Sequence, residues 1–345
     1  MVLQETSIVC SFLHNVNKPF FDPTINSGAL SQMPHCEKAK HISKCLELAI
    51  LLEVSAAKPG NVNFTVGFEG TRVEHFLSSA VAARSSFKEA AHRGIAVQDK
   101  KLTVCDVGMG QIIKKCVVDI NAWQKGGNTI LGTVILFVPI AVAAGMTPVK
   151  GNFDFSQLRE NIKLAVESTT AEDALHLYEA IDVAKPSGLN GAPDLDVHGP
   201  HSKERILEEN VSLYQVFKIA ADYDDICSEW VNNYPITFNL AYPYLSEQLR
   251  SRDLNTAIVH TFLKVLSEHP DTFIARKVGY EKACEISLDA KKVMELGGVE
   301  TSNGRKSLRE FDRKLRESAN LLNPGTTADI TAAALALCTL SGYRP

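Results

Sequence analysis

The chain has 345 residues, of which 45% are hydrophobic, and its 36 Lys and Arg against 40 Asp and Glu give a formal net charge of -4. This length accommodates one large domain or two of ordinary size, with a substantial core. Because there is no excess of basic residues, nucleic acids and anionic membranes are disfavoured as partners.

The cysteines and the apolar stretches predict a cytoplasmic protein without a secretory signal or a membrane-spanning helix. The eight cysteines are scattered singly, without CxxC pairs or zinc-ribbon spacing, which is typical of reduced thiols in a cytoplasmic protein. The N-terminal stretch MVLQETSIVCSFL has no basic region before its short apolar segment, so we expect no secretory signal. The longest apolar run, Ile130 to Gly145, is 16 residues long and contains Pro139. It is too short to span a bilayer and predicts a buried core helix.

In chain order, residues 1–37 lack sustained periodicity and predict an irregular N-terminal arm. From residue 38 the apolar residues recur at helical spacing, first in EKAKHISKCLELAILLEVSAA and then in VEHFLSSAVAARSSFKEAAHRG, which we expect to stop at Gly94. Further helices are predicted near 106–120, 128–145, 155–167, 170–182, 203–220, 222–232, 236–249, 252–267, 271–296, 306–321 and 325–341. Only KLTVCDVG, near 101–108, alternates like a strand. The sequence therefore predicts an all-α fold, a single large multi-helix bundle over 38–345.

The longest predicted loop is KPSGLNGAPDLDVHGPHS, Lys185 to Ser202, and loops of such length inside a compact domain are usually functional or disordered. Its composition favours function. Asp194 and Asp196 lie two residues apart, and carboxylates at that spacing in an extended segment can share a divalent ion, as where magnesium bridges substrate phosphates. A solvated acidic loop is the alternative.

Two other stretches place polar residues at helix ends. KPGNVN follows a helix and carries Lys58 beside a Gly/Asn turn that exposes backbone N–H groups, so it is either an anion site or a plain helix C-cap. KGGNTILGT opens the most apolar helix, where Asn128 or Thr129 is either an N-cap or a phosphate contact.

Acidic and basic residues gather in the last third of the chain. In ADYDDICSEW, Asp222, Asp225 and Glu229 fall on one helix face, and a cation, arginines or solvent must relieve their repulsion. In HPDTFIARKVG, Asp271 is a natural N-cap, whereas Arg276 and Lys277 suit a polyphosphate. GxSxG, HExxH and GxGxxG are absent. Acids that can hold magnesium and basic helix ends that can hold phosphates suggest an enzyme of nucleoside triphosphates.

Six ordered stretches from about residue 45 to 340 resemble the triphosphoribosyl-dephospho-CoA synthase family, in its archaeal-like branch. They are EVSAAKPGNVN, FEGTRVEHFLSSA, GGNTILGT, GLNGAPDLDV, HPDTFIARKVG and LNPGTTADITAA. The resemblance implies an ATP-dependent transferase in which the ribose 2′-hydroxyl of dephospho-CoA attacks C1 of the ribose of ATP and adenine leaves. It also implies an all-α fold, Mg2+ and a polyphosphate-binding pocket.

The same resemblance implies three groups of site residues at the motif positions. The expected acid–base groups are Glu53, Glu69 and Asp271. The expected substrate or phosphate contacts are Lys58, Asn61, Asn128, Thr129, Arg276, Asn323 and Asp329. The expected magnesium ligands, direct or through water, are Asp194, Asp196 and Asp225.

The chain departs from the family pattern at three positions. Asn63 stands where many relatives carry an acid or histidine, Gly70 follows FE where the archaeal-like branch often reads FED, and Ile130 replaces a polar residue. Each change loses a polar group that could act as ligand or base. A related ribosyl or phosphoribosyl transfer in another cofactor pathway and non-catalytic nucleotide binding are therefore the alternatives. The acceptor and the oligomeric state, a homodimer included, stay open.

Overall fold

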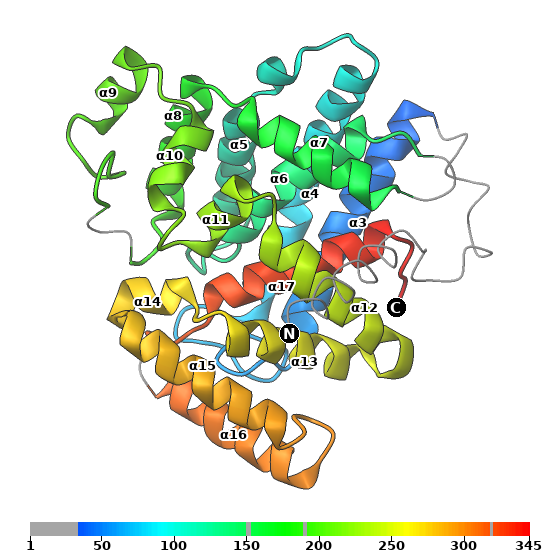
Figure 1. The fold of residues 1–345 in the computed structure, drawn as a ribbon, viewed down its shortest axis with the longest axis vertical. Helices are drawn as coiled ribbons and strands as arrows, with labels where there is room; N and C mark the ends of the chain where they lie inside the picture. Colours follow the sequence, from blue (N-terminus) through cyan, green and yellow to red (C-terminus); the bar gives the residue numbers. More distant parts are fainter. Residues whose placement is uncertain (1–33, 150–152, 189–191, 318–319) are drawn as a thin grey trace, which may run out of the picture.

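The computed structural model describes residues 34–149, 153–188, 192–317 and 320–345, and Figure 1 shows their fold. Residues 1–33, which make up most of the expected arm, lie outside the described residues. Within the described ranges the chain is helical, with no strand beyond an isolated bridge between Phe68 and Thr71. The prediction of an all-α fold is confirmed.

The helices follow the chain with short connections. They are α3 (His35–Ser55), α4 (Val73–Gln98), the 3-10 helix η2 (Val104–Val107), α5 (Met109–Trp123), α6 (Leu131–Met146), α7 (Phe155–Glu167), α8 (Ala171–Ala184), α9 (Ser202–Glu208), α10 (Leu213–Ala220), α11 (Asp225–Val231), the π-helix η3 (Thr237–Ala241), α12 (Tyr242–Ser251), α13 (Leu254–Glu268), α14 (Thr272–Val278), α15 (Tyr280–Glu295), α16 (Ser302–Arg316) and α17 (Gly325–Leu340).

Helix α6 forms the centre of the core, and apart from Gly132 all of its residues are buried. A helix that is apolar on every side has to be surrounded by other elements, and α6 packs against α3, α4, α5, α7, α11 and α17. In Figure 1, α5 and α8–α10 lie on one side of this core and α12–α16 on the other. Among the described residues, no helix has the length and apolarity required to cross a bilayer.

Gly94 does not end its helix as predicted, because α4 continues to Gln98. The glycine serves packing instead. A Cβ added at Gly94 would lie 2.0 Å from the carbonyl oxygen of Val142 in α6, and one added at Gly145 would lie 2.3 Å from the carbonyl oxygen of Ala91 in α4. The two glycines let the backbones of α4 and α6 touch, which is a tertiary constraint that the local sequence does not reveal.

Pro139 lies inside α6 and leaves a buried carbonyl to be satisfied. Proline has no N–H, so the carbonyl of Ile135, four residues earlier, loses its helical partner. The indole Nε1 of Trp230 in α11 donates to that carbonyl at 3.1 Å, and the hydroxyl of Tyr234 donates to the carbonyl of Leu136 at 2.9 Å. Buried hydrogen bonds thus replace the missing helical bond and anchor the end of α11 to the core.

Two of the predicted helices are divided in the structure. The segment 203–220 forms α9 and α10, because Ser212 begins α10 with a capping box that includes Gln215. The segment 271–296 forms α14 and α15, because Gly279 between them has a φ of 97°. The strand-like stretch near 101–108 contains η2. The other predicted helices are found within a few residues of their expected bounds.

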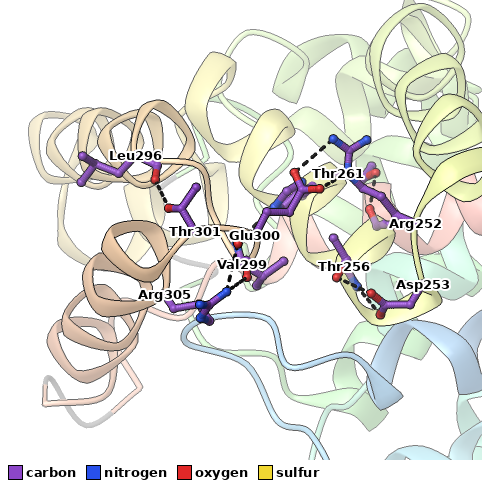
Figure 2. Close-up of polar contacts among 11 residues, drawn as sticks. Arg252, Asp253, Thr256, Thr261, Leu296, Val299, Glu300, Thr301 and Arg305 are labelled. Atoms are coloured by element: carbon purple, nitrogen blue, oxygen red, sulfur yellow. Dashed lines mark hydrogen bonds and ion pairs between the residues drawn. The ribbon is translucent and has the colours of Figure 1, made fainter.

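The connection between α15 and α16 is fixed to the short segment between α12 and α13, as Figure 2 shows. Arg252 pairs with Glu300 through two hydrogen bonds of 2.9 and 3.0 Å. Arg305 donates to the carbonyls of Val299 and Glu300 at 2.9 and 3.0 Å, and Thr301 caps α16. These contacts set the position of the α15–α16 hairpin, whose helix α16 supports the site described next.

Candidate functional site

A cavity of about 490 Å³ opens among the described residues, between the start of α6, helices α8, α10 and α11, and the starts of α14 and α17. Its volume is in the range of small-molecule sites. Its wall has two chemically different parts. Polar residues come from the segment after α3 and from the starts of α6 and α17, whereas α8, α10 and α11 contribute mostly apolar side chains.

Most of the residues that the sequence singles out line this one cavity. They are Glu53, Lys58, Asn61, Asn128, Thr129, Asp194, Asp196, Arg276, Asn323 and Asp329. Three others do not line it. Glu69 is exposed in the turn before α4, Asp225 lies in the first turn of α11, and Asp271 is buried behind the wall.

Glu53 and Lys58 form a buried pair at the end of α3. The Lys58 ammonium lies 3.1 Å from Glu53 Oε1, and it also donates to the backbone carbonyls of Glu53 and Ala56. Burial raises the pKa of Glu53 and lowers that of Lys58, and their mutual attraction opposes both shifts. Lys58 therefore caps α3 as well as lining the cavity, and its contact with phosphate stays a prediction.

The segment after Lys58 is held by α16. The N–H of Gly60 donates to Asp312 at 2.8 Å, and Arg316 donates to the carbonyl of Asn61 at 2.6 Å. Gly60 has a φ of 68°, and a Cβ there would lie 2.7 Å from Leu315. Only glycine fits this turn, which places the side chain of Asn61 at the cavity wall.

The start of α6 forms the second polar part of the wall. The N-cap of α6 is Ile130, so the prediction of Asn128 or Thr129 at that position is wrong. Asn128 nevertheless stabilises the helix start, because its Oδ1 accepts from the N–H of Leu131 at 3.2 Å. The hydroxyl of Thr129 lies 2.7 Å from that of Ser79 in α4. Both Asn128 and Thr129 line the cavity, so the hydrogen bond of Asn128 to Leu131 is compatible with a substrate contact, which stays a prediction.

Asp329 faces the start of α6 from the first turns of α17. Its carboxylate accepts a hydrogen bond from the hydroxyl of Thr133, and a Cβ at Gly132 would lie 2.1 Å from Asp329 Oδ2. Burial raises the pKa of Asp329 to about 7; the Thr133 hydrogen bond opposes this shift, and the nearby charge of Glu53 adds to it. Asp329 thus lines the cavity as an acid that titrates near neutrality.

Asp271 joins α14 to α17. It caps α14 by accepting from the N–H of Ile274 at 3.0 Å, and its other oxygen accepts from the N–H and hydroxyl of Thr327, both at 2.8 Å. Burial raises the pKa of Asp271. The N-cap prediction is confirmed, and the arrangement fixes the two helix starts that carry Arg276 and Asp329.

Arg276 pairs with Asp224 across the cavity wall. Asp224 is the N-cap of α11, where it accepts from the N–H groups of Ile226 and Cys227 at 2.9 and 3.4 Å. The sequence analysis chose Asp225 from this acidic run and missed Asp224. The available signal was the preference for aspartate at an N-cap, where the carboxylate accepts from the first N–H groups of the helix. Thr133, the partner of Asp329, was missed as well.

Asp194 and Asp196 shape the loop before α9. Asp194 Oδ1 accepts from Arg205 at 2.7 Å and from the N–H of Leu195 at 2.8 Å. Asp196 accepts from the N–H groups of Ala192 and His198, both at 2.8 Å. Across the described ranges, no three His, Cys, Asp or Glu side chains are grouped to hold a metal ion. An ion at this loop would need further ligands from a substrate or from water.

The three departures from the family pattern have different consequences. Asn63 accepts three hydrogen bonds from Thr65 and Val66 in a turn, and Gly70 has a φ of 76° with no atom near an added Cβ. Neither of them lines the cavity. Ile130 does line it, so that departure alone alters the described wall.

A family described as ATP:dephospho-CoA triphosphoribosyl transferase matches residues 39–345. A Citrobacter koseri protein named as a 2-(5''-triphosphoribosyl)-3'-dephosphocoenzyme-A synthase is 31% identical over 98 residues, or 28% of this chain and 32% of that protein. The match therefore spans about a third of that relative.

A solved structure from Archaeoglobus fulgidus, described as a triphosphoribosyl-dephospho-CoA synthase, has a similar fold. The TM-score is 0.56, the sequence identity is 24%, and the alignment covers 78% of this chain and 100% of that one. The family match extends over nearly all of the described helices, including every motif that contributes to the cavity. The chain belongs to the ATP:dephospho-CoA triphosphoribosyl transferase family.

Proposed function

We propose that the protein transfers the 5-triphosphoribosyl group of ATP to a hydroxyl group of dephospho-CoA or a similar acceptor, with release of adenine. The observation that carries this proposal is the cavity itself. Stretches that are far apart in the sequence contribute polar residues to this cavity, among them Lys58, Asn128 and Asp329, in a chain of this transferase family. A protein whose polar helix ends were only caps would not need them to converge.

The polar part of the wall suits a triphosphate. Helices α6 and α17 both begin there, and the first N–H groups of a helix attract anions. Arg276 adds a buried guanidinium, and its Nε has no hydrogen-bond partner among the described residues. An N–H left unpaired beside two helix starts is suited to a phosphate oxygen.

The apolar part of the wall suits the uncharged portion of the acceptor. Leu177 and Ile181 of α8, Val216 and Phe217 of α10, and Ile226 of α11 line this part. Burial of apolar ligand groups against such side chains favours binding by about 25 cal/mol per Å². We therefore assign the triphosphate to the α6–α17 end and the pantetheine arm of dephospho-CoA to the α8–α10–α11 end.

Magnesium fits the acidic residues of the loop before α9. Mg2+ is usually held by one or two carboxylates together with substrate phosphates, and Asp194 and Asp196 offer two carboxylates at the wall. We propose these two residues as its protein ligands, while Asp225 lies outside the cavity wall. When bound, the ion would neutralise charge on the substrate phosphates that reach this loop.

The test is adenine release from ATP and Mg2+, followed by chromatography with mass detection, with and without dephospho-CoA. Adenine together with a triphosphoribosyl adduct of the acceptor supports the proposal. If the protein binds ATP but releases no adenine with any acceptor, a non-catalytic nucleotide-binding protein is favoured. If adenine is released and an adduct forms with a different acceptor, the related ribosyl transfer is favoured.

A pair of variants separates catalysis from binding. Alanine at both Asp194 and Asp196 is expected to reduce turnover more than affinity for ATP measured without Mg2+. Asp182→Ala is the matched control, because Asp182 forms an exposed ion pair with Lys203 and does not line the cavity. Equal turnover in the double variant and the control would contradict the assignment of Asp194 and Asp196.

A further inference from the structure

The proposed transfer requires a general base that takes the proton of the attacking hydroxyl group. Cavity carboxylates that form an ion pair with Lys or Arg are poorly suited to be this base. Glu53 pairs with Lys58, Asp224 with Arg276, and Asp194 with Arg205. An adjacent positive charge stabilises the ionised form of a carboxylate and weakens it as a base. These pairs position the wall, and another carboxylate is better suited to the proton.

Asp329 has the geometry of a positioned base. Its carboxylate lines the cavity, and among the described residues it takes part in no ion pair within 4.0 Å. The hydroxyl of Thr133 donates to one oxygen, Oδ1. The other oxygen, Oδ2, lies against Gly132, where even a methyl group would clash at 2.1 Å. The glycine thus makes room for the carboxylate, and the threonine fixes its orientation.

The surroundings of Asp329 also adjust its basicity. Its pKa is raised to about 7, mainly by burial, with the charges of Glu53 and Asp271 adding to the shift and the Thr133 hydrogen bond opposing it. The Arg276 guanidinium also attracts the Asp329 carboxylate, although its ion pair is with Asp224. A general base is most effective when its pKa lies near the working pH, since it is then both ionised and able to hold a proton. Asp271 is less suited to such a role, because both of its oxygens hold the starts of α14 and α17 and it does not line the cavity.

We propose that Asp329 is the general base that accepts the proton of the attacking hydroxyl group; this assignment rests on the proposed function. The hydroxyl oxygen forms a bond to C1′ of ATP as the bond from C1′ to the base nitrogen breaks, and the bonding electron pair leaves with adenine. The hydroxyl proton passes to Asp329 and then to solvent, and adenine takes one proton from solvent, so the transfer is proton-neutral.

The decisive experiment is the pH dependence of kcat/KM for wild type, Asp329→Asn and Thr133→Val, with ATP affinity measured by calorimetry. In the wild type we expect activity to fall below about pH 7. Asp329→Asn should lose about 10²–10⁴-fold in turnover, which is the usual contribution of a general base, and should still bind ATP. Thr133→Val removes a hydrogen bond to the ionised form of Asp329, so the acid limb of its pH profile should move to higher pH.

Glu229→Gln is the matched control. Burial raises the pKa of Glu229 to about 7 as well, but Glu229 holds the N–H groups of Ile236 and Thr237 and does not line the cavity. Its acid limb should therefore stay where the wild type has it. If the limb followed Glu229, the assignment to Asp329 would be overturned.

The outcomes separate the two proposals. Failure of the wild-type protein to release adenine with any acceptor would overturn the proposed function and the base with it. Wild-type turnover with full activity in Asp329→Asn would overturn the base alone. If Asp329→Asn does not fold, Thr133→Val provides the test. A folded, active Thr133→Val protein whose pH profile has the same acid limb as the wild type would contradict Asp329 as a base oriented by Thr133.

Discussion

Replacing Asp329 by Asn should make the stability difference between variant and wild type depend on pH. The pKa of Asp329 is about 7 in the folded protein, against 3.8 for an ordinary aspartate. Between these values the folded form binds the proton more strongly than the unfolded form does, so the wild type loses stability as pH rises. Asn cannot titrate, so the variant does not share this loss.

The size of the effect follows from the shift. One pKa unit corresponds to 1.36 kcal/mol, so a shift of about three units gives about 4 kcal/mol, fully present below pH 4 and lost as pH passes 7. Of this, about 1.5 kcal/mol is already lost at pH 5. Between pH 5 and pH 8 the variant should therefore gain about 2–3 kcal/mol relative to the wild type.

Urea unfolding at pH 5, 6, 7 and 8, followed by circular dichroism, measures this difference directly. Glu229 also titrates near pH 7, but it is present in both proteins and cancels in the comparison. The Thr133 hydroxyl can donate to the amide oxygen of Asn, so that hydrogen bond does not confound the result. A difference constant within about 0.5 kcal/mol over this pH range would mean that folding leaves the Asp329 pKa unchanged, and the reasoning would be refuted.

Three further changes test the fold and the phosphate end of the cavity. Trp230→Phe removes the donor to the carbonyl of Ile135 and should cost about 1–3 kcal/mol in the free energy of unfolding, measured with urea at pH 7. Gly94→Ala places a methyl group against the α6 backbone and should lower stability by about 1–3 kcal/mol or more; an unchanged melting temperature would contradict the close crossing of α4 and α6. Arg276→Lys removes the unpaired Nε and should weaken ATP binding about tenfold, measured by calorimetry. The neighbouring Lys277 is not expected to compensate, because it already donates to the carbonyl of Asn320. Full affinity in the variant would exclude Arg276 as a phosphate contact.

The sequence predicts the helices well because their apolar residues recur at the helical period, and that period is a local property. The helix prediction fails where a single residue changes the backbone although the apolar period continues. Gly279, with its positive φ, interrupts a pattern that otherwise runs on from α14 to α15. Gly94 shows the opposite error, since a glycine that resembles a helix end is required by a contact with α6. Such a contact joins residues far apart in the chain, so no local rule detects it.

Most of the predicted site residues line the cavity, but Glu69, Asp225 and Asp271 do not, and the pairings could not be predicted. The motifs name the side chains that meet at the cavity, whereas the ion pairs depend on the relative positions of whole helices. The adjacent residues Asp224 and Asp225 illustrate this. Asp224 caps α11 and pairs with Arg276, and Asp225, one residue later, lies outside the cavity wall. A shift of one position in the start of α11 would exchange their surroundings, and sequence reasoning does not fix helix starts to one residue.

In the stretch KPGN, Lys58 could either cap the end of α3 or belong to the cavity. Its contacts show that it does both. Lys58 satisfies carbonyls at the end of α3 and also stabilises the ionised form of Glu53 against burial. A charged Glu53 in turn raises the pKa of Asp329. Positive charge on Lys58 thus acts on Asp329 through Glu53, without any contact with substrate. In a cavity built from helix ends, the residues that terminate the helices also set the charges of their neighbours, so a capping role and a functional role follow from the same contact.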